Sequence, residues 1–446
     1  MQTLRLAELL GALSQALDLT EGQPAGHCVR CAYIGTRLGR ELGLGGPVLA
    51  DLYYTLLLKD LGCSSNAARI CQLYLVDDLA FKADFKQIDG SLPQVLRFVL
   101  SHTGLKAGLS ERFRAILHIF QNGGTIAREL IETRCHRGAE IAAKMHFSAS
   151  VCEGILSLDE HYDGSGKPEG LSGDQIPMFS QIALLAQVAD VFQVAAGPQA
   201  AIREVSGRSG TWFSPSLVAA FCRLAEDEAF WSELTSDELE SLVLALEPAV
   251  VERLVDEDYL DDIAEGFANV IDSKSPYTSN HSERVTLFAD MIAEEMGISA
   301  ERRRWLRRVA LLHDIGKLGV SNGILDKPGK LDDIEWTEMR EHAAMSRTIL
   351  KRIPAFAELA EVAGAHHERL DGKGYPDGLS GDEICLETRI ITTADIFDAL
   401  TAERPYRAAM PVSKAFAIMT DMLDTAIDPG CFDALQRAVG RLEMAA

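Results

Sequence analysis

An internal duplication limits the possible folds of this chain more than any other feature. The string DGSGKPEGLSGDQIP at residues 163–177 nearly repeats DGKGYPDGLSGDEI at residues 371–384. A second match lies upstream, where LLLKDLG at 56–62 answers ALLHDIGK at 310–317. Because copies of one sequence pattern fold in the same way, the duplication predicts two tandem domains of similar architecture.

The two copies differ in length between these matches. The offset between them is 254 residues upstream, 208 at the central string, and 205 for ADVF at 189–192 against ADIF at 394–397. The first copy therefore carries an insertion of about 48 residues between Gly62 and His136. This insertion, within residues 63–135, is rich in Leu, Phe and Lys and is predicted to form additional helices.

Helical periodicity predicts the fold class. Both copies are dominated by Ala, Leu, Glu and Arg at helical spacing, and runs of alternating β-branched residues are almost absent. We expect an all-α protein made of two tandem helical bundles, at residues 1–230 and 261–446. An acidic stretch with a Ser-Asp start signal separates them and predicts a helical connector at residues 231–260.

Charge and cysteine content limit the partners and the compartment. A net charge of −23 argues against binding nucleic acid or an anionic membrane, because neutralising phosphates requires clustered Lys and Arg. The longest apolar runs fall short of the roughly 18 residues that span a bilayer, so no membrane helix is expected. Nine scattered cysteines, an odd number, favour a reducing compartment, and a cytoplasmic location is predicted.

The second copy gathers residue types that bind metals. Five histidines and two aspartates carry this pattern: His281, His313, Asp314, His342, His366, His367 and Asp395. A lone histidine is most often an ordinary hydrogen-bonded residue, but several polar groups in apolar segments would be costly unless they bound an ion. Imidazole and carboxylate ligands without cysteine suit iron, manganese or zinc.

This number of ligands exceeds the needs of one tetrahedral ion and indicates a two-metal centre, with Asp314 as the natural bridge. Two ions lower the pKa of a bridging water to give a hydroxide, and they stabilise the attacking and leaving oxygens of a phosphoryl displacement. The predicted chemistry is phosphoester hydrolysis. Lys317, one turn after His313, and Arg404 and Arg407 are predicted phosphate contacts.

These motifs resemble the HD-GYP family of the HD phosphohydrolase superfamily. The strings that carry the resemblance are HDIGK at 313–317, HHERLDGKGYPDGL at 366–379 and ADIFDALTAERPYR at 394–407. The resemblance covers essentially all of residues 261–446 and implies an HD-type helical bundle with two divalent ions, Fe or Mn. It implies hydrolysis of cyclic di-GMP to pGpG, with further cleavage to GMP left open.

The resemblance also implies roles for individual residues. It implies one ion held by His281, His313, Asp314 and Asp395, and another held by Asp314, His342, His366 and His367. The implied catalytic residues are His313, Asp314 and Lys317, and the implied substrate contacts are Lys317, Gly374, Tyr375, Pro376, Arg404 and Arg407. Family members with a third ion place a Glu where this chain has Tyr277, so a binuclear centre is expected.

The first copy departs from this pattern. Lys59 replaces the His of the dyad, Cys63 replaces the Lys, and Leu158 and Asp159 replace the paired histidines. The residues interpreted as retained are His27, Asp60, His136 and Asp190. A cation where a ligand belongs should abolish binuclear binding. The first half therefore resembles a degenerate HD-GYP domain, predicted to be regulatory and to provide a surface for a homodimer or a signalling partner.

Three functions remain open. The first is a cyclic di-GMP phosphodiesterase. The second is hydrolysis of another nucleotide, either a cyclic dinucleotide such as cGAMP or a guanosine polyphosphate, and the intact GYP string disfavours the polyphosphate. The third is a non-catalytic signalling or scaffold protein. The complete ligand set of the second copy favours catalysis, because a scaffold does not need seven convergent ligands.

Overall fold

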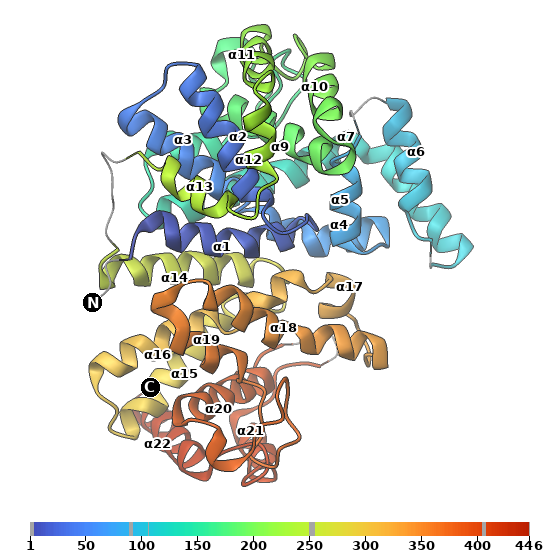
Figure 1. Cartoon of the computed structure of the whole chain (residues 1–446). Helices are drawn as coiled ribbons and strands as arrows, with labels where there is room; N and C mark the ends of the chain where they lie inside the picture. The colour runs from blue at the N-terminus through green and yellow to red at the C-terminus, as the bar shows by residue number, and fades with distance from the viewer. Residues whose placement is uncertain (1–3, 89–91, 106, 249–254, 404–406, 446) are drawn as a thin grey trace. The chain divides into compact units, whose positions relative to one another are not determined.

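A computed structural model describes residues 4–88, 92–105, 107–248, 255–403 and 407–445. Within these residues every regular element is a helix, and the only strand-like pairings are isolated bridges, which confirms the predicted all-α class. The chain divides into two compact units, Met1–Asp256 and Glu257–Ala446 (Figure 1).

The N-terminal unit is built around α2 (His27–Glu41), which packs against α1 (Leu6–Thr20), α3 (Gly46–Leu58) and α9 (Met178–Ala196). The apolar side chains of α1 recur at helical spacing and are buried, which explains this packing. Other elements outside the insertion include α8 (Ala149–Leu156), η2 (Gly173–Gln175), α10 (Pro198–Gly207) and α11 (Pro215–Ala225).

The C-terminal unit is built around α15 (His281–Glu295), which packs against α16 (Ala300–Leu312), α20 (Leu386–Thr401) and α22 (Pro429–Ala445). A second layer is formed by α18 (Asp333–Lys351), which contacts α19 (Ala357–Gly364) and the 3-10 turn η4 (Ile315–Gly319). The remaining elements are α14 (Glu257–Asp272), α17 (Asn322–Leu325), η5 (Pro354–Phe356), η6 (Gly381–Glu383) and α21 (Val412–Thr420).

The two units repeat one arrangement. Helices α2 and α3 of the first correspond to α15 and α16 of the second, and two glycines mark a shared contact. A side chain at Gly62 would meet the carbonyl oxygen of Arg134, and one at Gly316 would meet that of His342. Such close approach of two backbones leaves room only for glycine. The same interhelical contact is therefore present in both units.

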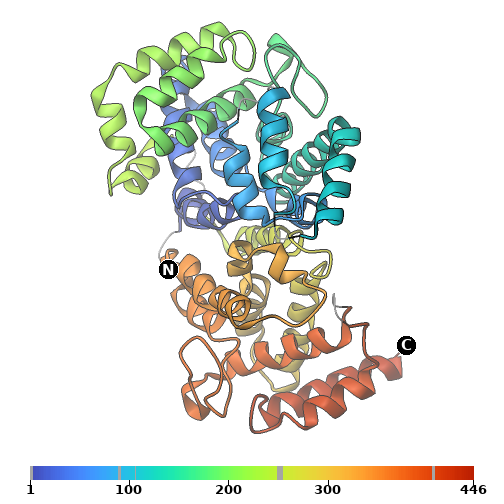
Figure 2. The same cartoon turned by 90° about the vertical axis from the view of Figure 1, so that its right-hand side faces the viewer.

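The insertion of the first copy forms helices, as its composition predicts. It contains η1 (Cys63–Asn66), α4 (Ala67–Tyr74), α5 (Asp78–Phe85), α6 (Leu92–His102) and the first part of α7 (Leu109–Lys144) (Figure 2). Ile70, Phe81 and Phe98 form a small core of its own. The insertion is thus a helical subdomain rather than a long loop.

The segment predicted as a connector, residues 231–260, is divided between the two units. Helices α12 (Glu228–Leu234) and α13 (Leu239–Leu246) pack against α2, where Phe230 and Val243 are buried. Helix α14 packs against α16 in the C-terminal unit. The apolar faces of these helices are covered by their own unit, which a free connector would leave exposed. Residues 249–254 lie outside the described residues.

One helix, α9, is long and apolar enough to cross a bilayer by length and composition. Its mean hydropathy is 1.4, but 67% of the apolar window is buried inside the unit. Core helices of globular domains share this property, because they are apolar on every side. The helix therefore gives only weak support for a membrane span.

Candidate metal centre

The predicted ligands of the second copy come from separate elements and converge at one place. Helices α15, α16, α18, α19 and α20 supply, in order, His281, the His313-Asp314 pair, His342, the His366-His367 pair and Asp395. His281 begins α15, the His313-Asp314 pair directly follows α16, and the His366-His367 pair follows α19 after one residue, Ala365. Helix ends thus position most of these side chains in the interior of the unit.

Asp314 lies between two groups of histidines. Its Oδ2 lies 3.3 Å from Nε2 of His281 and 3.3 Å from Nε2 of His313. Its Oδ1 lies 3.4 Å from Nε2 of His342 and 3.6 Å from Nε2 of His366. Each carboxylate oxygen therefore faces a different pair of imidazoles, the arrangement that a ligand shared by two ions requires.

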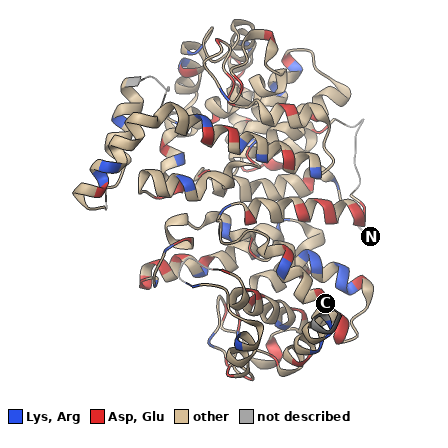
Figure 3. Ribbon diagram, turned by 180° about the vertical axis from the view of Figure 1, so that it is seen from behind, with Lys and Arg blue, Asp and Glu red and all other residues tan. Residues whose placement is uncertain are grey.

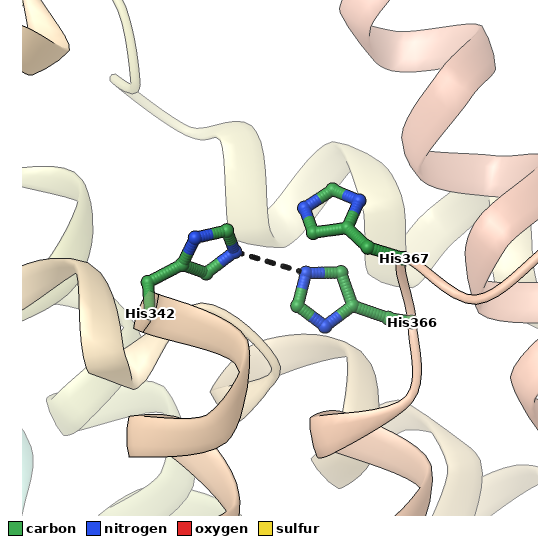
Figure 4. Close-up of side chains that lie close together, drawn as sticks. All are labelled: His342, His366 and His367. Carbon is green, nitrogen blue, oxygen red and sulfur yellow. Dashed lines mark hydrogen bonds between the residues drawn. The ribbon is translucent and has the colours of Figure 1, made fainter. Parts of the chain in front are cut away.

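His367 completes the second group. Nε2 of His342 lies 3.3 Å from Nε2 of His366, and the His367 ring lies 4.0 Å from the His366 ring. Figure 4 shows the three imidazoles close together, His342 on α18 and the other two on the segment after α19. The ligand atoms of this group lie within 4.8 Å of one another, as do those of His281, His313 and Asp314. Each group contains three of the four members of a predicted ligand set, and the binding of ions stays a prediction.

Hydrogen bonds determine which nitrogen of each imidazole faces the centre. Nδ1 of His313 donates to a backbone carbonyl oxygen at 2.6 Å. Nδ1 of His342 and of His366 each donate to the carbonyl oxygen three residues earlier at 2.5 Å. Because a carbonyl oxygen only accepts, Nδ1 carries the proton and Nε2 keeps its lone pair. This is the state in which imidazole binds a metal.

Three polar atoms at the centre are buried and have no hydrogen-bond partner among the described residues: Nε2 of His281, Nε2 of His313 and Oδ1 of Asp314. The carboxylate of Asp395 lies nearby, with Oδ1 3.5 Å from Nε2 of His281. An unsatisfied buried polar group costs roughly 1–3 kcal/mol. Two divalent cations, one at each group of ligands, would satisfy these atoms, so the donor set fits the predicted metal ions.

Burial and neighbouring charges shift the pKa values at the centre. Although burial raises it, the neighbouring His313 and Lys317 hold the pKa of Asp314 well below its usual range. Burial lowers the pKa of His342 to about 3. For His281 burial acts in the same direction, but contacts with two carboxylates raise its pKa to about 9. Asp314 and His342 thus have the protonation states of metal ligands, whereas His281 would release its proton on binding an ion.

Two of the predicted substrate contacts lie beside the centre. Nζ of Lys317 donates to Oδ2 of Asp314 at 2.5 Å. The ring of Tyr375 packs 4.8 Å from the ring of His367, and Pro376 next to it is exposed. The GYP turn therefore reaches the histidine group directly, although its contact with substrate stays a prediction.

The two predicted arginine contacts are placed differently. Arg407 donates to the backbone carbonyls of Ala399 and Leu400, near the end of α20. Arg404 lies outside the described residues. In this conformation the Arg407 guanidinium is hydrogen-bonded to the end of α20. The role of both arginines in phosphate binding stays a prediction.

In the N-terminal unit, a lysine ammonium occupies the corresponding centre. Nζ of Lys59 lies 3.0 Å from Nε2 of His27 and 3.2 Å from Oε1 of Gln187, and it donates to the carboxylate of Asp60. All four side chains are buried. Despite burial, Lys59 holds the pKa of Asp60 far below its usual range. The protein itself thus supplies the positive charge that an ion would supply.

An internal ion pair fills the second position of that unit. Arg134 lies where the C-terminal unit has His342, and its guanidinium donates to the carboxylate of Asp159. Leu158 next to it offers no ligand atom. The N-terminal unit therefore has a cation in place of each predicted ion.

Two further groups of potential ligands in this unit are already paired. One is His27, Cys31 and Asp190, and the other is Glu21, Asp60 and Cys63. Nε of Arg30 donates to Asp190 at 2.6 Å, and Nζ of Lys86 lies 2.7 Å from Glu21. These lysine and arginine partners neutralise the carboxylates without a metal.

One correspondence predicted between the copies, that of His136 with His342, is wrong. Arg134 occupies this position, because it lies opposite Gly62 as His342 lies opposite Gly316. His136 is exposed, and its Nδ1 contacts a backbone carbonyl of its own helix. The contact between helices distinguishes two candidates that lie less than one turn apart, and it agrees with the offset of 208 residues at the central string.

The predicted correspondence of Asp190 with Asp395 is also wrong. Asp190 accepts a hydrogen bond of 2.7 Å from Nδ1 of His27, just as Asp398 accepts one of 2.7 Å from Nδ1 of His281. Gln187 is therefore the counterpart of Asp395. The ADVF and ADIF strings are alike but lie three residues out of register, nearly one helical turn.

Comparison with known proteins identifies the family. The family described as HD domain matches residues 105–210 and 265–431. A 3'3'-cGAMP-specific phosphodiesterase of Vibrio cholerae is 54% identical over 440 residues, which cover 99% of this chain and 96% of that protein. This chain belongs to the HD-GYP branch of the HD-domain family. The predicted resemblance is therefore confirmed.

Two further comparisons of this HD-GYP protein are informative. A cyclic di-GMP phosphodiesterase response regulator of Xanthomonas campestris is 40% identical over 178 residues, 40% of this chain and 47% of that protein. The crystal structure of a cyclic GMP-AMP specific phosphodiesterase of V. cholerae has a TM-score of 0.68 at 49% identity and covers 98% of both chains. The same all-α fold is thus present in a solved relative.

Sequence reasoning missed Asp398, which orients a ligand of the HD-GYP centre. Its Oδ2 accepts the hydrogen bond from Nδ1 of His281, and its Oδ1 accepts one of 2.5 Å from Nε of Arg284. Its spacing from Asp395 could have identified Asp398, because the two residues lie one turn apart and therefore on the same side of α20.

Sequence reasoning also missed Glu368, which shapes the GYP loop. Its carboxylate accepts hydrogen bonds from the backbone N–H groups of Asp377, Gly378 and Leu379 at 2.7 to 3.1 Å. A side chain at Gly374 would meet the backbone of Glu368. The duplication could have revealed this role, because Glu160 of the first copy corresponds to Glu368 and binds the corresponding loop.

Asp398→Asn is expected to weaken metal binding by roughly 10–100-fold, the usual effect of removing a hydrogen-bond partner that orients a ligand. Titration of the metal-free protein with Mn(II) would measure it. Asp382→Asn is the matched control, because the Asp382 side chain is fully exposed. Equal affinities in the two variants would rule out the orienting role.

Proposed function

We propose that this chain is a metal-dependent phosphodiesterase of cyclic dinucleotides that prefers 3'3'-cGAMP to cyclic di-GMP. The observation that carries the proposal is the approach of two imidazole groups to the two oxygens of Asp314. The relative named for 3'3'-cGAMP matches 99% of the chain, whereas the cyclic di-GMP phosphodiesterase of X. campestris matches 40%. The preference therefore differs from the one that the motifs alone suggest.

The chemistry assigned to the residues follows from their contacts. The two ligand sets would hold the proposed ions, Fe(II) or Mn(II), which would supply Lewis acidity to the phosphodiester. Asp314 stays ionised between the two sets, and Lys317 provides a cation for a phosphate oxygen next to them. The N-terminal unit hydrolyses nothing in this proposal, because Lys59 and Arg134 occupy its centre. Nine free cysteines are compatible with the proposed cytoplasmic location.

A nucleotide panel tests the substrate. Protein purified without air and loaded with Mn(II) or Fe(II) is incubated with 3'3'-cGAMP, cyclic di-GMP and cyclic di-AMP, and the products are separated by chromatography. We expect the highest kcat/KM for 3'3'-cGAMP. A higher value for cyclic di-GMP would reverse the assigned preference, and no cleavage of any of them would refute the enzyme.

Two exposed residues on α18, Arg340 and Trp336, are suited to contact the nucleotide. The Arg340 guanidinium lies 5.4 Å from the centroid of the Tyr375 ring and 5.7 Å from that of Trp336. Tyr375 in turn packs on His367. An exposed indole and a planar guanidinium are surfaces on which nucleobases stack. We expect a base of the substrate to lie here.

Arg340→Ala is expected to raise KM for 3'3'-cGAMP about tenfold, because stacking of one base contributes roughly 1–3 kcal/mol. Metal content should not change, since Arg340 is not a predicted ligand. Lys351→Ala is the control, because Lys351 is exposed on the same helix. A KM equal to that of the control would exclude the contact, and loss of metal would indicate a structural role.

A further inference from the structure

Exposed apolar side chains concentrate on the insertion of the N-terminal unit. Among the described residues, seven of the seventeen exposed large apolar side chains lie between positions 96 and 120: Leu96, Leu100, Leu105, Leu109, Phe113, Leu117 and Phe120. They belong to α6, the turn after it and the first half of α7. Monomers rarely leave contiguous apolar surface of this kind exposed. The catalytic unit has no counterpart of this segment.

Helix α7 carries an apolar stripe with a period of seven residues. The stripe runs through Phe113, Leu117, Phe120, Gly124, Ala127 and Ile131, alternately four and three residues apart. Phe113 is 67% exposed and Leu117 44% exposed. The opposite side of α7 is buried in the unit. A stripe with this period is the pattern by which one helix packs along another.

We propose that this stripe of α7 is the surface through which two copies of this chain associate, with the two α7 helices side by side and parallel. Gly124 would allow close approach, because a side chain at this position would have nothing within 4 Å. An exposed Leu or Phe side chain offers on the order of 100 Å², so Phe113, Leu117 and Phe120 on the stripe offer about 300 Å². The roughly 800 Å² that each partner buries in a standard interface is approached when the four other exposed side chains of α6, the turn after it and α7 are included.

Charge along the stripe favours the parallel orientation. Arg114 and Arg128 follow the stripe residues Phe113 and Ala127 directly in sequence and therefore flank the stripe. Antiparallel helices centred on Gln121 would place Arg114 opposite Arg128 of the second copy, which costs free energy. In a parallel pair, each arginine instead lies beside apolar or small residues that flank the stripe of the second copy. The aliphatic part of the arginine side chain covers these residues.

The positive charge of α6 and the first part of α7 would also suit partners other than a second copy of this chain. Between positions 92 and 122 the sequence has four cations and one acidic residue, Glu111, in a chain of net charge −23. Figure 3 shows the blue bands on these helices. An acidic helix of another protein or an anionic membrane would also complement these cations. These two occupants are the alternatives that the experiment must distinguish.

Light scattering coupled to size exclusion of the full chain tests the proposal. We expect a mass of twice 48.6 kDa, and half of that for the double variant Phe113→Glu, Leu117→Glu. Val48→Glu is the control, because Val48 is 49% exposed on α3 of the same unit and should leave the mass unchanged. Circular dichroism establishes that each variant is folded. A monomeric wild-type chain at tens of micromolar, or a dimer that persists in the double variant, would overturn the proposal.

Crosslinking and vesicle binding test the orientation and the other occupants. With Phe113→Cys, parallel helices bring the two thiols together, so mild oxidation should give a covalent dimer above the background of the wild-type chain. A dimer that does not crosslink would contradict the parallel arrangement. Sedimentation of a monomeric chain with phosphatidylglycerol vesicles, but not with phosphatidylcholine vesicles, would assign the stripe to a membrane and refute self-association.

Discussion

Asp314→Asn is expected to abolish hydrolysis of cyclic dinucleotides and to remove most of the bound metal. Each oxygen of Asp314 faces a different pair of imidazoles, so the substitution affects both ligand sets together. Metal ions contribute several kcal/mol of transition-state stabilisation, and a loss of about 4 kcal/mol lowers kcat about 1,000-fold. The measurements are kcat with 3'3'-cGAMP and elemental analysis of the purified variant.

Two further variants make this result specific. His342→Ala removes a ligand from one set only, so it should lose less metal than Asp314→Asn. Asp382→Asn changes a fully exposed carboxylate of the same unit and should retain both metal and turnover. If Asp314→Asn kept its full metal content, or if His342→Ala lost more metal than it, Asp314 would not be the shared ligand.

The ligands of the C-terminal unit could be predicted because they stand in short strings with distinctive residue types. His313 and Asp314 are adjacent, and so are His366 and His367. The structure adds the way in which Asp314 separates the two groups, which depends on the packing of α16 between other helices. The spacing of residues along a chain does not contain that information, because the ligands come from different elements.

Correspondences between the two copies were harder to predict, since a shift within one helical turn changes little in the sequence. Arg134 and His136 both lie on α7, and the contact with Gly62 shows that Arg134 takes the position of His342. The offset of 208 residues at the central string agrees with this assignment, whereas the offset of 205 does not. The same applies to Asp190, which is identified by its hydrogen bond to His27. The helices of the predicted connector could be read from the sequence, but an acidic composition does not reveal which unit covers an apolar face.

Loss of the internal cation of the N-terminal unit should be strongly destabilising. Lys59→Met leaves the carboxylate of Asp60 fully buried without its partner. Breaking a buried ion pair from one side typically costs about 3–5 kcal/mol. In a unit of this size that lowers the midpoint of thermal unfolding by about 10 °C. Calorimetry of the full chain would measure the shift.

The calorimetric experiment also shows whether the N-terminal unit needs metal. A chelator should lower the transition of the C-terminal unit, which loses its proposed ions, and should leave that of the N-terminal unit unchanged, because Lys59 and Arg134 are covalently part of it. The double variant Lys59→Met, Asp60→Asn removes both charges and should regain most of the lost stability, since neither partner is then left buried and unpaired. A chelator-sensitive N-terminal transition, or a double variant no more stable than Lys59→Met, would show that Lys59 does not replace an ion.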